Sequence, residues 1–267
     1  MIDPRTSVIP VRLKRIGRTV AFTSSKGGVG KSSTAVVSAL LLAKKGHRVG
    51  ILDFDFHGAT DHLFLGVTPS FPEEEGGILP VVVVPGLSFM SITPFTGEHG
   101  VPLRGEDITN SIIELLAVTI WGALDYLIID MPPGIGDELM DLIKYIPQCE
   151  TVVLSSPSVV SAKVVQRLMG LLEESNVGVS GVVVNETYPV DKKDQSGEGA
   201  AGSELQAGFR NKLRGTIQFD PSLERAIGSS DRLIETDFAA DVEKILNRIL
   251  KGKPSPRSEI GERKAGS

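Results

Sequence analysis

The sequence contains very little cysteine and no long apolar run. Cys149 is the only cysteine among 267 residues, so no disulfide can form within one chain and a reducing compartment is expected. No apolar run approaches the roughly 18 residues that a membrane-spanning helix needs. The first twenty residues also lack the apolar stretch of a signal peptide. These absences predict a cytoplasmic protein without a membrane partner.

Positive charge is also scarce. The chain has 28 Lys and Arg residues against 33 Asp and Glu residues, a net charge of -5, which does not favour a nucleic-acid partner. A hydrophobic content of 41% suffices for one substantial core. We expect one globular domain over residues 16–251, after an N-terminal arm (1–15) and before a flexible polar tail (252–267). Residues 191–202, which are small and charged, are expected to be mobile like the tail.

Short apolar runs alternate with longer stretches of helical periodicity. This alternation is typical of an α/β fold with a doubly wound, mostly parallel sheet flanked by helices. The expected strands are Thr19–Ser24, Arg48–Asp53, Val81–Val84, Leu87–Ile92, Tyr126–Asp130, Thr151–Ser156, Val177–Asn185 and Gly215–Phe219. The expected helices are Ser33–Lys45, Asp107–Trp121, Ser161–Glu174 and Phe238–Lys251.

The stretch SSKGGVGKSS (24–33) lies between an expected strand and an expected helix. Glycines permit the backbone angles and the close approach that let consecutive N–H groups converge on a phosphate, and a helix N-terminus adds positive charge. Lys31 can supply an ammonium group to the phosphates, and Ser32 a hydroxyl to magnesium. The alternative is a glycine turn that merely connects strand to helix. The phosphate-binding residues would be Gly27, Gly28, Val29, Gly30, Lys31, Ser32 and Ser33.

Carboxylates follow two further strands. Asp53 and Asp55 stand in LDFDFHG, and Asp130 ends the apolar run of YLIIDMPPGIGD. Ligands of α/β sheets bind beyond the carboxyl ends of the strands, and the aspartate of such an apolar run holds magnesium in P-loop proteins. The two prolines after Asp130 make a stiff turn suited to a switch. Ordinary turn residues at strand ends are the alternative.

Four stretches, SSKGGVGKSS, LDFDFHG, LIIDMPPGIGD and FDPSLERA, together resemble the Mrp/ApbC branch of the deviant Walker A P-loop ATPases, a group that includes MinD and ParA. One departure is Ser25, where the usual glycine loop begins with glycine. The resemblance covers about residues 16–251. It implies a homodimer that binds ATP and Mg²⁺ between its subunits, hydrolyses ATP slowly, and carries or assembles iron-sulfur clusters for client apoproteins.

The resemblance also implies roles for single residues. Lys26 corresponds to the signature lysine that reaches the partner's nucleotide across the dimer, and would act like an arginine finger. Asp55 would position the attacking water, and Asp53 would help to hold hydrated magnesium. Asn185 resembles the asparagine that binds adenine, and Pro221 lies where relatives line the base pocket. A solvated lysine and common turn residues are the alternatives.

One expected feature of the family is missing. Many members hold a bridging cluster with a C-x-x-C pair, but residues 185–202 contain no cysteine. Cys149 is expected to be buried, and the histidines His57, His62 and His99 are not expected to form a metal site. Cluster binding would therefore need ligands from a partner.

Two other functions stay open. A MinD- or ParA-like positioning switch would not need a cluster, although the tail lacks an amphipathic face for a membrane. A regulatory ATP binder that only recruits client proteins is the third possibility.

Overall fold

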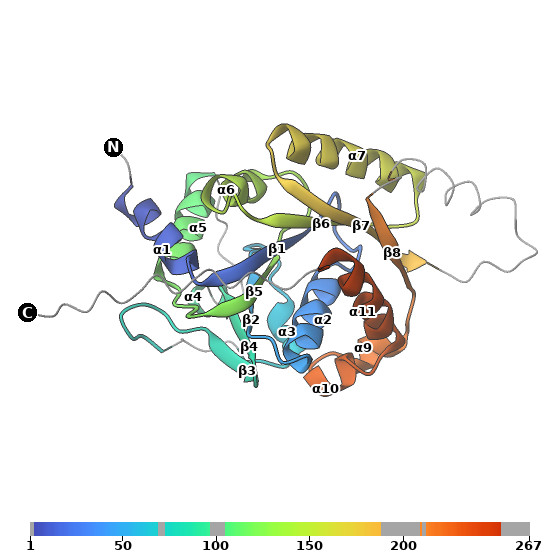
Figure 1. The fold of residues 1–267 in the computed structure, drawn as a ribbon, viewed down its shortest axis with the longest axis horizontal. Helices are drawn as coiled ribbons and strands as arrows, with labels where there is room; N and C mark the ends of the chain where they lie inside the picture. The colour runs from blue at the N-terminus through green and yellow to red at the C-terminus, as the bar shows by residue number, and fades with distance from the viewer. Residues whose placement is uncertain (1–2, 69–72, 97–104, 188–208, 210–211, 252–267) are drawn as a thin grey trace, which may run out of the picture.

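The fold was obtained as a computed structural model that describes residues 3–68, 73–96, 105–187, 209 and 212–251. Its centre is an eight-stranded sheet of order β3-β4-β2-β5-β1-β6-β7-β8 (Figure 1). Every neighbouring pair is parallel except β3 and β4. The expected α/β fold with a mostly parallel sheet is confirmed. The segments expected to be mobile, 191–202 and 252–267, lie outside the described residues, as does His99.

All eight expected strands form, with ends shifted by a few residues. The apolar, largely β-branched runs of the inner strands suit burial on both faces, whereas the edge strands β3 and β8 are only partly buried. The strands are β1 (Ile16–Ser24), β2 (Val49–Asp53), β3 (Val81–Val84), β4 (Leu87–Ser91), β5 (Leu124–Asp130), β6 (Glu150–Ser155), β7 (Gly178–Thr187) and β8 (Leu213–Gln218).

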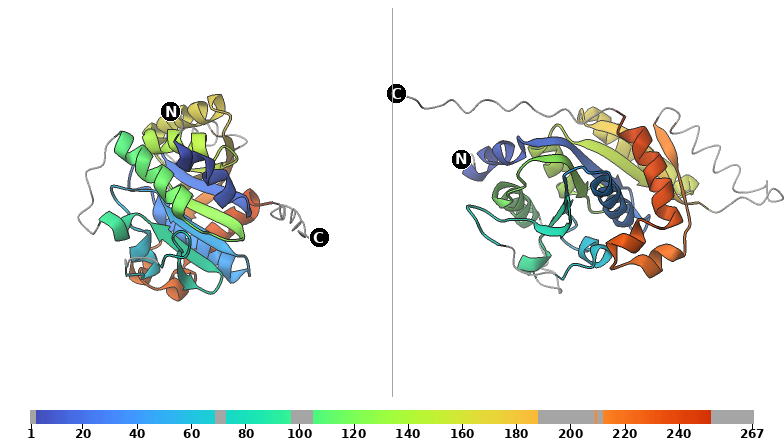
Figure 2. Two further views of the ribbon diagram at one scale, coloured as in Figure 1. Left: turned by 90° about the vertical axis from the view of Figure 1, so that its left-hand side faces the viewer. Right: turned by 60° about the horizontal axis from the view of Figure 1, so that its bottom comes forward.

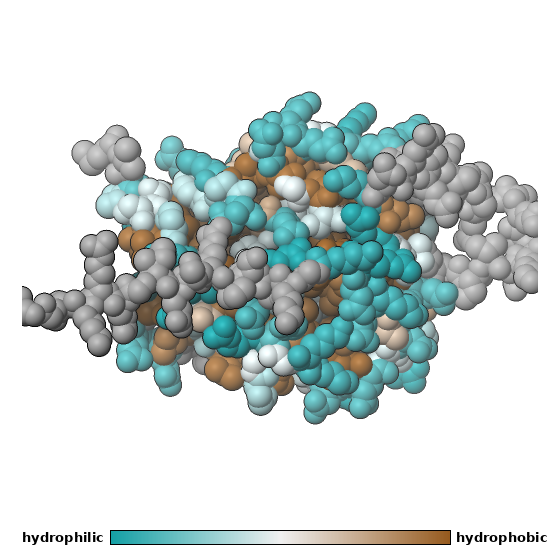
Figure 3. Space-filling model, viewed as in Figure 1, coloured by the Kyte–Doolittle hydropathy of each residue, from teal (hydrophilic) through white to brown (hydrophobic). Residues whose placement is uncertain are grey.

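Helices cover both faces of the sheet (Figures 1 and 2). On one face lie α2 (Lys31–Lys44), α3 (Asp61–Leu65), α9 (Ser222–Ala226), α10 (Ser230–Leu233) and α11 (Asp237–Ile249). On the other lie α1 (Ile9–Leu13), α5 (Glu106–Val118), α6 (Asp137–Tyr145) and α7 (Val159–Glu174). The 3-10 helix η1 (Pro4–Ser7) precedes α1, and α4 (Thr93–Thr96) follows β4. Hydrophilic side chains cover the outer surface of α7 (Figure 3).

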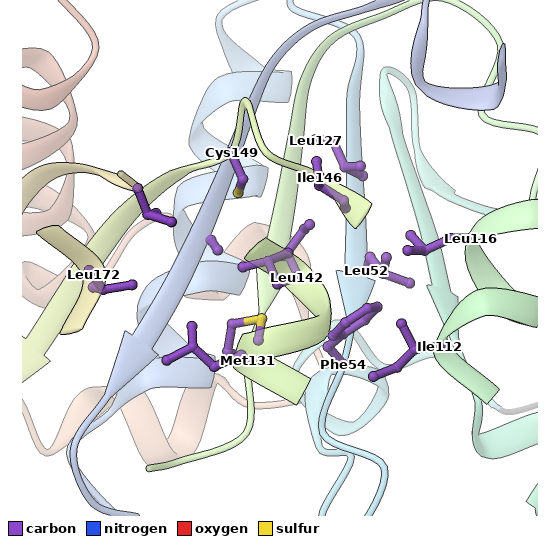
Figure 4. Close-up of a cluster of buried hydrophobic side chains, with 14 of the residues drawn as sticks. Leu52, Phe54, Ile112, Leu116, Leu127, Met131, Leu142, Ile146, Cys149 and Leu172 are labelled. Carbon is purple, nitrogen blue, oxygen red and sulfur yellow. The ribbon is translucent and has the colours of Figure 1, made fainter. Parts of the chain in front are cut away.

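Each face of the sheet has its own apolar core. Figure 4 shows the cluster between the sheet and α5, α6 and α7, where Leu142 and Phe54 are fully buried. Cys149 is one of the buried members of this cluster, as the sequence predicts. Burial raises the pKa of its thiol well above the ordinary value, so Cys149 stays protonated and is screened from solvent.

Several helices have no counterpart in the expectations from sequence. Helix α1 lies within the expected N-terminal arm and buries Ile9 and Leu13, which belong to the same core as residues of α5. Helix α6 begins soon after the Pro-Pro-Gly turn, with an acidic first turn that suits a helix N-terminus. None of the helices in the described parts of the chain is long and apolar enough to cross a membrane.

Candidate nucleotide-binding site

The glycine loop joins the end of β1 to the start of α2 and borders a cavity. Helix α2 begins at Lys31, two residues earlier than expected, so Lys31 and Ser32 lie in its first turn. Gly28 and Gly30 both have φ +74°, a left-handed angle that favours glycine. The cavity measures about 230 Å³ and is lined by Ser24, Gly27, Gly28, Gly30, Lys31, Ser32, Ser33, Asp55, Thr60, Phe64 and Pro133.

Lys31 and Ser32 are tied to Asp130 at the end of β5. The Lys31 ammonium donates to Asp130 Oδ1 over 2.7 Å, and both side chains are buried. The Ser32 hydroxyl donates to Asp130 Oδ2 over 2.6 Å. Both oxygens of this carboxylate are therefore used. A phosphate that takes the Lys31 ammonium must first replace Asp130 as its counter-charge.

Two more buried aspartates lie beside Asp130. Asp53 is its direct register partner across β2 and β5, and Asp61 is the first residue of α3. One carboxylate oxygen of each of the three residues lies within 4.8 Å of the others. Burial, with the charge of Asp130 adding to it, raises the pKa of Asp53 to about 7 and that of Asp61 well above its ordinary value. Burial also raises the pKa of Asp130, although Lys31 and Ser32 oppose this shift.

Asp55 stands at the edge of the cavity with a fixed carboxylate. The side chain is half-buried, and its Oδ1 accepts from the backbone N–H of Gly58 over 2.8 Å and of His57 over 3.3 Å. Its own N–H donates to Asp53 Oδ1 over 3.0 Å. The loop after β2 thus holds one oxygen of Asp55 in place. Among the residues that the structure describes, the hydrogen bonds to this carboxylate all end on Oδ1.

Main-chain hydrogen bonds join the loops beyond the strand ends. The Phe54 N–H donates to the carbonyl of Asp130 over 2.8 Å, which links the loop after β2 to β5. The Gly134 N–H donates to the carbonyl of Ser24 over 2.7 Å, which links the Pro-Pro-Gly turn to the glycine loop. The three loops around the cavity are therefore connected through their backbones.

The remaining residues predicted from sequence lie outside the cluster of Lys31, Ser32 and Asp130. Lys26 is exposed on the glycine loop. The Asn185 side chain is buried below that loop and donates through Nδ2 to the Val29 carbonyl over 3.0 Å. Pro221 is exposed as the residue before α9 and does not line the cavity. His57 is exposed on the loop after β2.

Sequence reasoning predicted no role for Asp61, Thr60 or Phe64, and it named Pro133 only as part of the stiff turn after Asp130. The last three line the cavity, and Asp61 joins the buried carboxylates. Asp61 ends the same acidic stretch, DFDFHGATD, that supplies Asp53 and Asp55. Its carboxylate was the only signal in the sequence for this role. Its place beside Asp53 and Asp130 depends on how residues 54–60 turn back toward β5.

A doubly wound sheet with a glycine loop after β1, a lysine and a serine opening the next helix, and an aspartate ending a neighbouring strand defines a P-loop NTPase. A family model described as ParA, NUBPL iron-transfer P-loop NTPase, matches residues 15–252. The chain belongs to this family.

Curated relatives match over most of this chain. The iron-sulfur cluster carrier protein of Methanocaldococcus jannaschii is 30% identical over 263 residues, which cover 94% of this chain and 90% of that protein. The protein of the same name from Saccharolobus solfataricus is 34% identical over 227 residues, 82% of this chain and 76% of that protein.

Solved structures agree with the fold. A nucleotide-binding protein from Archaeoglobus fulgidus, in complex with ADP, is 30% identical with a TM-score of 0.72, covering 88% of this chain and 96% of that one. The cell division ATPase MinD of Pyrococcus furiosus is 18% identical with a TM-score of 0.63, covering 87% of this chain and 98% of that one. The second likeness supports the fold alone.

Proposed function

We propose that this protein is a cytoplasmic, homodimeric ATPase that binds ATP with Mg²⁺, hydrolyses it slowly, and uses the nucleotide state to carry or assemble iron-sulfur clusters for client proteins. The observation that carries the proposal is the Lys31, Ser32 and Asp130 cluster beside the glycine-loop cavity. Residues 16–251 form the ATPase domain, with 1–15 as an arm and 252–267 as a polar tail.

The glycine loop binds the phosphates of ATP in this proposal. Backbone N–H groups of residues 27–33 face the phosphate oxygens, and the first turn of α2 adds the positive end of its dipole. The Lys31 ammonium moves from Asp130 to the β- and γ-phosphates. Breaking a buried ion pair is unfavourable unless another anion replaces the lost partner, so the triphosphate itself drives this exchange. Asn185 and Pro221 contribute to adenine binding.

Ser32, Asp53 and Asp130 would hold the magnesium ion. Hydroxyl and carboxylate oxygens are the ligands that Mg²⁺ prefers, and the hydrogen bond between Ser32 and Asp130 places these donors together. When bound, Mg²⁺ neutralises charge on the phosphates. Asp55 positions the attacking water, because its carboxylate is held by the Gly58 N–H at the edge of the cavity.

Lys26 completes the site across the dimer. Its exposure on the glycine loop leaves the ammonium group able to reach a second subunit. We expect ATP with Mg²⁺ to shift the protein to twice its mass in light scattering. Lys26→Ala should abolish hydrolysis while ATP affinity is retained, because a cation that acts on the partner's transition state contributes about 10³–10⁵ in rate.

Lys163→Ala, which removes an exposed lysine on α7, is the matched control and should hydrolyse ATP normally. Asp55→Asn should bind ATP and leave it uncleaved. Normal turnover in Lys26→Ala would remove this lysine from the mechanism, and normal turnover in Asp55→Asn would do the same for Asp55.

The cluster would be cargo held with help from a client. Cys149 is the only cysteine, and it is buried in the core of Figure 4, so this chain offers no exposed thiolate. Anaerobic incubation with iron, sulfide and a client apoprotein, followed by metal analysis, should show cluster transfer that depends on ATP. Transfer that is unaffected by ATP would contradict nucleotide gating.

The burial of Cys149, the only cysteine, also favours a second candidate function. A MinD- or ParA-like switch that recruits a partner in its ATP-bound dimer needs no cysteine. A protein that dimerises with ATP and binds a partner, but transfers no iron under any nucleotide condition, would support this alternative.

A further inference from the structure

Asp61 is a buried carboxylate that accepts no hydrogen bond from the described part of the chain. Its side chain is 0% exposed, and neither carboxylate oxygen has a hydrogen-bond partner among the residues that the structure describes. Its backbone N–H, by contrast, donates to Asp53 Oδ2 over 3.2 Å. An unpaired carboxylate in the interior costs several kcal/mol unless a counter-charge or donor compensates it. The fold therefore holds a strong oxygen ligand in place without using it.

The two neighbouring carboxylates, unlike Asp61, accept hydrogen bonds. Asp53 accepts backbone N–H groups at both oxygens, and Asp130 accepts from Lys31 and Ser32. Each of these two carboxylates therefore has donors that stabilise its charge. Asp61 faces both, with one oxygen of each residue within 4.8 Å of the others.

The charge of the three carboxylates and the distances between them both favour a divalent cation at this cluster. Within the described residues, Lys31 forms an ion pair with Asp130 at this cluster, so the three carboxylates and Lys31 together carry a formal charge of -2. Opposite oxygen ligands lie roughly 4.0–4.2 Å apart around Mg²⁺ and roughly 4.6–5.2 Å apart around Ca²⁺, and adjacent ones lie closer, so a separation within 4.8 Å suits a divalent cation.

We propose that Asp61 is a direct ligand of a divalent cation which it binds together with Asp53 and Asp130, and that this site is occupied before any nucleotide arrives. The site deepens the proposed function, since the same cation would later meet the phosphates, but its occupancy rests only on the three carboxylates. Ser32 connects the cluster to the cavity, because it lines the cavity and contacts Asp130.

The proposal has a consequence for nucleotide binding. When a phosphate takes the Lys31 ammonium, Asp130 loses its counter-charge and the formal negative excess around the cation rises from two to three. The cation is then held more tightly by the same carboxylates. Metal and nucleotide should therefore each raise the affinity of the other, as linkage requires.

The test uses the full chain, freed of metal with EDTA and of nucleotide by dialysis. Mn²⁺ is the probe, because it takes oxygen ligands and its free form gives a measurable paramagnetic resonance signal. Titration should show about one bound Mn²⁺ per chain. Asp61→Asn should weaken binding by more than about tenfold, since even indirect partners of a metal site contribute about 10–100-fold. Asp231→Asn, which changes an exposed aspartate on α10, should bind as the natural protein does.

Thermal unfolding provides the second measurement. Mn²⁺ should raise the Tm of the natural protein and of Asp231→Asn, but not of Asp61→Asn. In EDTA the Asp61→Asn variant should be at least as stable as the natural chain, which also establishes that it folds; Asp61→Ser repeats the comparison with a second neutral side chain.

Absence of Mn²⁺ binding by the nucleotide-free natural protein would overturn the proposal, and so would unchanged affinity in Asp61→Asn. These results are separable from the proposed function. A protein that binds Mn²⁺ but not ATP would refute the ATPase and support this site. A protein that binds ATP but takes up Mn²⁺ only when ATP is present would support the ATPase and refute a cation site that is filled before the nucleotide binds.

Discussion

Gly30 of the glycine loop lies against the Asn185 side chain of β7. A β-carbon at this position would overlap the side-chain amide nitrogen of Asn185 and lie 3.3 Å from its Cγ. Gly28 has the same φ of +74°, but a β-carbon there would meet nothing within 4 Å. The two glycines thus share a backbone requirement and differ in the space around them.

This difference sets the expected free energies of unfolding. Alanine in the left-handed region costs about 1–2 kcal/mol, which is the whole expected loss for Gly28→Ala. Gly30→Ala adds the overlap with Asn185, about 1–3 kcal/mol for a forced shift in a packed region, for a total of about 2–5 kcal/mol. In an Asn185→Ala background the overlap is gone, so Gly30→Ala should cost only about 1–2 kcal/mol.

Urea unfolding at 25 °C measures these values through Trp121, the only tryptophan, whose side chain is 7% exposed. Asn185→Ala alone should cost about 1–3 kcal/mol, because the Val29 carbonyl loses its donor. The double-mutant cycle with Gly30→Ala should show a coupling of about 1–3 kcal/mol, and the cycle with Gly28→Ala none. Equal losses for the two glycine variants, or an excess at position 30 that survives Asn185→Ala, would refute the reasoning.

Three further predictions concern the core and the helix ends. Cys149 should react with iodoacetamide far more slowly in native protein than in urea at pH 8, because burial raises the pKa of its thiol; equal rates would contradict its burial. Leu142→Ala, at a fully buried position, should cost about 2–5 kcal/mol in urea unfolding, whereas Met140→Ala on the same helix, 46% exposed, should stay within about 0.5 kcal/mol. Thr236→Ala should lower the unfolding free energy by about 1 kcal/mol, because the hydroxyl that accepts from the Ala239 N–H over 3.1 Å is lost; an unchanged value would mean that this cap adds no stability.

The strands were predictable from sequence because most contain a short apolar run bounded by turn residues. Helices α3, α9 and α10 were not, since four or five residues are too few to show a period of 3.6. Helix α6 was missed for another reason. The Pro-Pro-Gly turn indicates where β5 ends, but it does not show that a helix follows; α6 forms where Leu139 and Leu142 pack into the core.

The candidate site was predictable only where one short stretch carries it. Lys31 and Ser32 can be recognised because they end the glycine loop, and Asp130 because it ends an apolar strand. The contact of Asn185 with the Val29 carbonyl joins residues 156 positions apart, and no local pattern contains that information. The same holds for Asp61, whose carboxylate reaches the cluster only because the loop after β2 folds back toward β5.

The connection between the loops after β1, β2 and β5 runs through peptide groups. Most side-chain replacements leave these peptide groups intact, so the hydrogen bonds between the loops do not depend on which side chains the loops carry. Alanine scanning would consequently miss this linkage, and replacing the amide by an ester at Phe54 or Gly134 would be the way to cut it.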